Sequence, residues 1–188
     1  MGCGANPDAN LAKQLRLLRR AVDEPAGLGL DDADIDVEVI ALAAGFYRDL
    51  GLRRLRLIVN SMGDPEGRAA YVEALRIHLL AHAGALGDAF REKVEASPLR
   101  VLDSKNPDWQ DVIASAPQIT EHLGDDARAH FERVQEGLQA LGVGFELDPR
   151  LVRGFDYYTR TTFEFQSDAL DAAQNAVGGG GRYDGLIE

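Results

Sequence analysis

Residues 151–166 have the sequence LVRGFDYYTRTTFEFQ, and residues 177–186, VGGGGRYDGL, follow after a polar stretch typical of a turn. From residue 157 onward, alternate positions of the first segment carry Tyr, Thr or Phe, the period-two pattern of a β-strand. Together the two segments predict an antiparallel hairpin. The four glycines at 178–181 weaken a strand, so we expect something to need close access to the backbone there.

The densest polar cluster of the chain starts at Arg153 and includes Tyr157 and Tyr158. A guanidinium offers a planar fork of donors for a phosphate or carboxylate, and tyrosine hydroxyls can read a neutral polar ring. Neighbouring residues of a strand point to opposite faces, so both tyrosines reach one pocket only if the strand is bulged. The alternative is a strand with a buried aromatic face and an arginine paired with an acid.

Upstream of the hairpin the pattern is mainly helical. A helix is expected from residue 32 to 50, with Ile35, Val39, Leu42, Phe46 and Leu50 near one face. Alternating apolar residues at 55–59 predict a strand, and Asp64-Pro65-Glu66 has the composition of a helix start.

Residues 65–141 are almost wholly helical in pattern, with breaks expected at Gly84, Gly87, Gly124 and three prolines. The last of these helices is expected to be capped by Asp125. A short strand is expected at 143–147.

Near the N-terminus, residues 8–24 form a basic amphipathic pattern. Leucines and a valine recur at helical spacing, with four basic residues between them. Such a helix can bind a membrane surface or a partner, but an ordinary surface helix is the simpler interpretation.

Composition excludes several classes of protein. The 188 residues hold 20 Lys plus Arg against 31 Asp plus Glu, a net charge of −11, which opposes generic binding to nucleic acids or anionic membranes. The single cysteine, Cys3, excludes a disulfide framework and a thiolate zinc site. With no long apolar run and no secretory signal, we expect a soluble cytoplasmic protein without a membrane partner.

Two further patterns lack the context that their chemistry needs. The glycine run is not set between a strand and a helix as in a dinucleotide-binding fingerprint. His78 and His82 share a helix face, but without a third ligand we expect no metal site.

The two hairpin segments resemble the histidine-specific motif and the following glycine-rich strand of histidyl-tRNA synthetases. Upstream, residues 36–43 (DVEVIALA), 60–64 (NSMGD) and 98–105 (PLRVLDSK) resemble further family segments in the same order. The resemblance covers about residues 27–188 and implies an α+β fold: part of the class II synthetase antiparallel sheet with a mostly helical insertion.

The resemblance also implies an activity. The family activates L-histidine with ATP and Mg²⁺ and transfers it to tRNA(His). Arg153 would be the catalytic residue, contacting the histidine carboxylate and the α-phosphate of ATP. Tyr157 and Tyr158 would belong to the histidine pocket, and Gly179, Gly180 and Gly181 would form its floor.

Four segments follow from this resemblance. Residues 1–26 are an unassigned amphipathic helix, and residues 27–64 and 143–188 belong to the catalytic domain. Residues 65–142 are the helical insertion that approaches the tRNA acceptor stem. Candidate phosphate contacts on the insertion, each of which is also readily explained as solvated surface, are Arg68, Arg76, Arg91, Lys93 and Lys105.

The family's dimer-forming motif and its main ATP-binding motifs are not found in this sequence. We therefore expect a synthetase fragment that does not aminoacylate on its own, and the family's homodimer is uncertain for it. Two alternatives stay open: a histidine-sensing regulatory subunit of ATP phosphoribosyltransferase, and a non-catalytic adaptor that binds tRNA or protein. The helical insertion argues against the regulatory subunit. The net charge of −11 argues against an adaptor that binds RNA.

Overall fold

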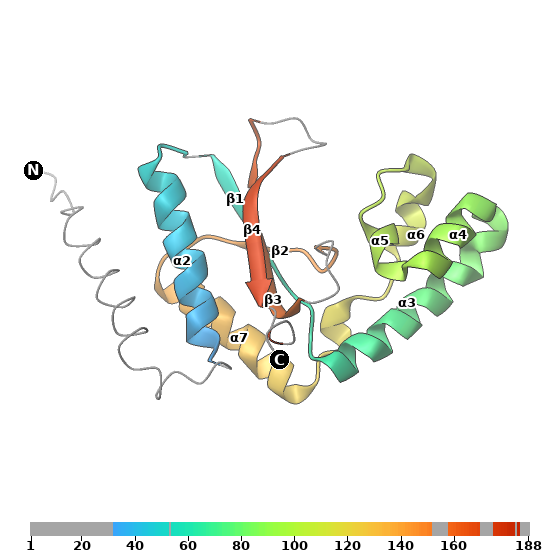
Figure 1. Ribbon diagram of the computed structural model, residues 1–188, viewed down its shortest axis with the longest axis horizontal. Coiled ribbons are helices and arrows are strands. Elements are labelled where there is room, and N and C mark those ends of the chain that lie inside the picture. Colours follow the sequence, from blue (N-terminus) through green and yellow to red (C-terminus); the bar gives the residue numbers. More distant parts are fainter. Residues whose placement is uncertain (1–31, 53, 152–157, 170–174, 183, 185–188) are drawn as a thin grey trace, which may run out of the picture.

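The computed structural model describes residues 32–52, 54–151, 158–169, 175–182 and 184. A small sheet carries helices α2 (Ala33–Asp49) and α7 (Asp125–Ala140) on one side, and a block of further helices lies to the other side (Figure 1). The described part of the chain is therefore α+β, as the sequence predicts. None of its helices has the length and apolar character needed to cross a membrane.

Four strands form the sheet, in the order β2-β1-β3-β4. Their bounds are Leu55–Ser61 for β1, Glu146–Leu147 for β2, Thr159–Ser167 for β3 and Ala176–Arg182 for β4. The β3–β4 pair is the antiparallel hairpin predicted from the sequence, and β1 pairs antiparallel with β3. The sheet is mixed, since β2 at one edge runs parallel to β1 after the chain crosses over through the helices between them.

One apolar core lies between the sheet and the helix pair α2 and α7. Leu57 and Val59 of β1 and Phe163 and Phe165 of β3 contribute its sheet layer. These residues alternate along their strands, so each strand turns its other set of side chains toward the opposite face.

Helix α2 buries a different face from the one that its large apolar residues predict. Ala33, Val37 and Ile40 are buried, whereas Val39 and Phe46 are 49% and 59% exposed. Small residues decide this orientation: a Cβ at Gly137 of α7 would lie 2.7 Å from a methyl of Val37, so the two helices are already in close contact. The expectation that the large residues mark the packed face is therefore wrong.

A second core lies within the helical block. Its members include Tyr71, Leu79, Phe90 and Ile113, together with Met62 just after β1. The elements of the block, in chain order, are α3 (Pro65–Leu86), α4 (Asp88–Ala96), α5 (Pro98–Leu102), η1 (Pro107–Trp109), α6 (Gln110–Ala114) and η2 (Ile119–Glu121). Asp64 caps α3 as predicted, by accepting a hydrogen bond from the Gly67 amide at 2.7 Å.

Several local expectations are corrected. Helix α3 continues through Gly84, since a single glycine costs only about 1 kcal/mol in a helix. Gly124, not Asp125, is the N-cap of α7, and Asp125 lies in the first turn. Helix α7 packs with α2 and the sheet rather than with α3–α6, so by packing the helical block ends before residue 125. The boundary at 142 remains a prediction.

Candidate functional site

The face of the sheet opposite α2 and α7 is mainly polar, with buried Ile58 of β1 as an apolar member. Asn60 of β1 pairs with Thr162 of β3, and Thr162 pairs in turn with Gly181 of β4. Glu164 and Gly179 occupy the next register position on the same face. Asn60 and Thr162 are 1% and 0% exposed. Buried polar side chains beside two glycines provide directional contacts next to bare backbone, which is the composition of a ligand site.

The segment that carries the predicted histidine motif leaves from this face. The Asn60 side-chain amide donates hydrogen bonds to the carbonyls of Pro149 and Leu151, at 3.2 and 3.1 Å. Arg153 and Tyr157 themselves lie outside the described residues. Their roles in binding histidine and ATP stay predictions.

The glycines of β4 divide between the two faces. A Cβ at Gly178 would overlap the Tyr47 hydroxyl, and one at Gly180 would lie 3.2 Å from the Phe163 ring, both on the helix side. A Cβ at Gly181 would lie 2.7 Å from the Tyr158 ring and 2.8 Å from the Thr161 carbonyl. Of the three glycines expected to form a pocket floor, Gly180 therefore presents its Cα to the core. Only Gly179 and Gly181 belong to the polar face.

Tyr158 connects the polar face to the helical block. Its ring covers Gly181 and packs against the core of the block. Its carbonyl accepts a hydrogen bond from Arg68 at 2.9 Å. Tyr158 is the one predicted pocket tyrosine that the structure describes, and it lies next to a predicted floor glycine.

A buried charged cluster joins α2, α7 and the end of β4. Asp36 lies 2.8 Å from Nε2 of His130 and 3.1 Å from Nη1 of Arg182. The three side chains are only 11%, 5% and 8% exposed. Arg182 also bonds Asp184, which accepts from the Thr159 hydroxyl at 2.8 Å. This network, the Asp36 cluster, fixes the end of the glycine-rich strand against two helices.

Hydrogen bonding assigns the tautomer of His130. Nδ1 lies 3.3 Å from Nη1 of Arg160, and a guanidinium can only donate. Nδ1 therefore accepts, and Nε2 carries the proton that is donated to Asp36. His130 as a whole residue is 7% exposed and belongs to the buried face of α7.

Arg160 is also held in an unusual backbone conformation. Its φ of +48° lies in the left-handed region that side chains disfavour. It sits at the register shift between Thr159 and Thr162, where β3 departs from regular pairing with β4. Such strain of about 1–3 kcal/mol persists only where surrounding contacts impose it. The alternating pattern gave no signal for this bulge or for the Asp36 cluster, because both depend on residues that are distant in sequence.

Asp103, directly after α5, interacts electrostatically with Glu164 of the polar face. Burial raises the pKa of the Asp103 carboxyl, and the Glu164 carboxylate raises it further. Lys93 and Lys105 act in the opposite direction without cancelling the shift. Residues 98–105, one of the family-like segments, thus include a carboxyl that is coupled electrostatically to the polar face.

This shift predicts a pH-dependent stability effect. A carboxyl with a raised pKa in the folded state destabilises the fold when ionised, so Asp103→Asn should raise Tm at pH 7. The gain should vanish as the pH falls below the ordinary carboxyl value of 3.8, where both states are protonated. We expect a change below about 1 kcal/mol, because solvent screens the site. Thermal melts from pH 3 to 8, with exposed Glu95→Gln as control, test this; a gain that persists at pH 3 would contradict it.

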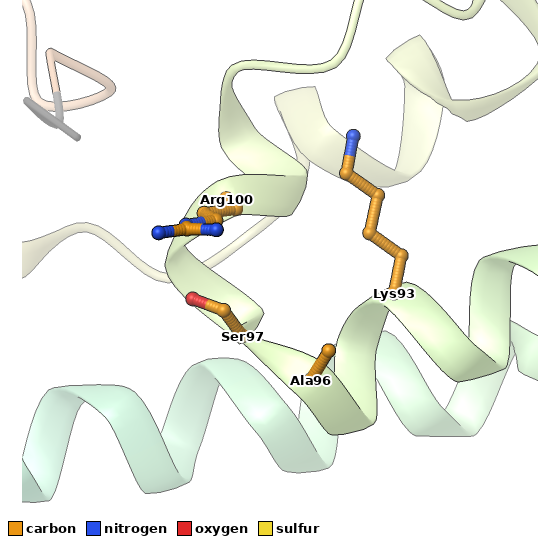
Figure 2. A pocket seen from close by; sticks show the side chains of 4 residues that line it. All are labelled: Lys93, Ala96, Ser97 and Arg100. Atoms are coloured by element: carbon orange, nitrogen blue, oxygen red, sulfur yellow. The ribbon is translucent and has the colours of Figure 1, made fainter.

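The candidate phosphate contacts differ in their surroundings. Arg68 is bonded to the Tyr158 carbonyl, and Arg76 pairs with Glu73 at 2.8 Å. Lys93 lies 5.4 Å from the centre of the Trp109 ring. It also lines a pocket of about 380 Å³ with Ala96, Ser97 and Arg100 (Figure 2). None of these four lining residues is acidic.

The two histidines at helical spacing have backbone partners. Nε2 of His78 lies 3.1 Å from the Val112 carbonyl, and Nδ1 of His82 lies 2.9 Å from the His78 carbonyl. Their rings are 4.9 Å apart. The His78 contact connects α3 to α6, whereas the His82 contact lies within α3.

Comparison with known proteins identifies the family. The profile of the histidyl-tRNA synthetase family matches residues 27–188. The histidine–tRNA ligase of Rhodococcus erythropolis is 48% identical over 161 residues, covering 86% of this chain and 37% of that protein. The histidine–tRNA ligase of a Geobacillus species is 46% identical over 162 residues.

A solved structure of the same family is also similar to this chain. Apo histidyl-tRNA synthetase of S. aureus matches with a TM-score of 0.62 and 36% identity, covering 82% of this chain and 37% of that one. The chain therefore spans a little over a third of the length of these relatives. Over residues 27–188, it belongs to the histidyl-tRNA synthetase family.

Proposed function

We propose that residues 27–188 form the histidine-recognising part of a histidine–tRNA ligase, which activates L-histidine with ATP and transfers it to tRNA(His). The observation that carries this proposal is the polar sheet face on which Tyr158 covers Gly181 beside buried Asn60 and Thr162. A flat imidazole could lie against the glycine-rich backbone while hydroxyl and carboxylate groups meet its nitrogens. A site built in this way rejects apolar analogues, because its own polar groups would be left unpaired.

Arg153 is proposed as the catalytic residue. A fixed cation between the histidine carboxylate and the α-phosphate stabilises the charge that develops as the adenylate forms. Asn60 supports this placement by holding residues 149 and 151, which lead directly to the arginine.

ATP with Mg²⁺ is the proposed co-substrate, and it supplies the phosphoryl group that activates the carboxylate. Among the described residues there is no group of three or more His, Cys, Asp or Glu side chains that could hold a metal ion. Mg²⁺ often binds through substrate phosphates and one or two carboxylates. In this chain Arg153 would contact the nucleotide.

Transfer to tRNA is proposed to use the helical block. The pocket of Lys93, Ser97 and Arg100 presents two cations and no acid, which suits a phosphate of the acceptor stem. A cytoplasmic location follows from the proposed substrate.

A chimera tests the proposal. Residues 27–188 replace the matching segment of the Rhodococcus erythropolis ligase, and aminoacylation of tRNA(His) is measured. We expect a functional enzyme in which Arg153→Ala lowers kcat by about 100-fold or more. Gly181→Ala should raise the KM for histidine by about 10-fold or more, because its methyl would displace Tyr158.

Gly84→Ala is the matched control, since a Cβ there meets no atom within 4 Å. It should leave both constants unchanged. A folded chimera that binds histidine but forms no adenylate would refute the ligase proposal and favour a histidine sensor.

A further inference from the structure

The outer face of α2 carries a row of apolar side chains of which Ile35 is partly buried and the others are exposed. We call Ile35, Val39, Leu42 and Phe46 the α2 stripe. Val39, Leu42 and Phe46 are 49%, 37% and 59% exposed, and Leu50, just beyond the helix, is 61% exposed. In Figure 1, no described helix or strand lies outside α2. A continuous apolar row of this size on a helix indicates a docking surface.

The helix cannot bury this stripe by rotating. Its other side is held by Val37 against Gly137 and by Ile40, which is fully buried. Tyr47 packs edge-to-face on Phe165 with ring centres 5.0 Å apart. Asp36 adds its buried bonds to His130 and Arg182. The stripe therefore needs a separate occupant.

We propose that residues 8–24 of this same chain pack as a helix antiparallel to α2, across the α2 stripe. These residues lie outside the described part of the chain, and their sequence predicts an amphipathic helix. They do not align with the histidyl-tRNA synthetase family, whose match begins at residue 27. The inference is independent of the ligase proposal.

The spacing of apolar residues in the two segments is the main argument for this packing. Leu11, Leu15, Leu18 and Val22 are separated by four, three and four residues, and the α2 stripe has the same separations. Spacings that alternate between three and four are those of helices that pack along a seam. Folding the chain back at residues 28–29 places every member of one row opposite a member of the other. The facing pairs are Leu11 with Phe46, Leu15 with Leu42, Leu18 with Val39, and Val22 with Ile35.

The lengths of the two helices and of the segment that joins them also fit this packing. Residues 8–24 are 17 residues long, as is α2, so each helix would span about 25 Å. Residues 25–32 join them, with Pro25, Gly27 and Gly29 suited to reversing the chain. Eight residues is within the usual length of a connection between antiparallel helices.

Charge is complementary. Residues 8–24 hold four basic side chains, all within 13–20, and three acids at the two ends, whereas α2 holds four acids and one base. One of these acids, Glu38, adjoins Val39, and its Oε1 is buried without a hydrogen-bond partner among the described residues. The basic segment 13–20 beside the acidic α2 is stabilising, and two copies of α2 would repel each other.

Disulfide formation in the full 188-residue chain tests this packing. In a Cys3→Ser background, two double variants place cysteines at facing positions: Leu15→Cys with Leu42→Cys, and Leu18→Cys with Val39→Cys. The control, Lys13→Cys with Leu42→Cys, moves one cysteine to the opposite helix face. The first pair and the control separate their cysteines by 27 and 29 residues, so the chain entropy of closing the loop is nearly equal.

The effective concentration of each pair is measured in glutathione buffers at low protein concentration, in water and in urea. We expect both facing pairs to form intramolecular disulfides with at least 10-fold higher effective concentration than the control in water, and with no difference in urea. Equal values in water would overturn the proposal. Intermolecular disulfides through Leu42→Cys would also overturn it, in favour of a second copy covering the stripe.

Discussion

Asp36→Ala is expected to lower the free energy of unfolding by about 3–5 kcal/mol, the cost of leaving a buried charge without its partner. The carboxylate accepts from His130 and Arg182, and all three side chains are at most 11% exposed. Without it, the one acidic partner left to Arg182 among the described residues is Asp184, which is 43% exposed, and His130 loses its acceptor. Chemical denaturation of the full chain measures the loss.

Two comparison variants distinguish the stability effect of the buried network from the effect of removing any carboxylate. Asp34→Ala removes a carboxylate two residues away, whose pairing with Arg133 is more than half exposed on both sides, and should cost below about 1 kcal/mol. Asp36→Leu combined with Arg182→Met should be less damaging than Asp36→Ala, because no charge is stranded. Equal losses for Asp34→Ala and Asp36→Ala would show that the buried cluster has no special role.

Phe90→Ala in α4 should destabilise the helical block by about 3–5 kcal/mol, the range for removing a buried aromatic ring. Phe90 is 0% exposed and packs edge-to-face on Trp109 with ring centres 5.0 Å apart. Trp109 is the single tryptophan of the chain, so its fluorescence reports directly on this core.

The same variant tests whether the two cores unfold separately. Because Phe90 belongs to the helical-block core and not to the core under the sheet, the Trp109 transition should move to lower denaturant while loss of strand signal in circular dichroism moves less. Ile77→Ala on the exposed face of α3, where the side chain is 61% exposed, should shift neither by more than about 0.5 kcal/mol. Coincident shifts of both signals for Phe90→Ala would mean that the cores unfold as one unit.

Local sequence was sufficient wherever the determining interactions are themselves local. The alternation in residues 157–166 predicts β3, the acid and proline at 64 and 65 predict the start of α3, and the hairpin follows from two strand patterns joined by a polar turn. The motif order identifies the family, and the family profile matches the same residues, 27–188.

The candidate site could be predicted only in part. Tyr158 and Gly181 meet as the motif implies, but the division of the glycines between the faces depends on the register of β4 against β3. Alternation along a strand separates two sets of residues without saying which set faces the core. The Asp36 cluster joins residues 94 and 146 positions apart, and no local pattern encodes such contacts.

Helix α2 shows most clearly what tertiary structure decided. Its sequence determines a helix with apolar residues on more than one face. Only the assembled fold selects the face that is buried, because Val37 packs closely on Gly137 of α7, where a Cβ would lie 2.7 Å from a methyl of Val37. Close packing of the two helices depends on a glycine that lies about 100 residues away in the sequence, and no local pattern in α2 encodes it.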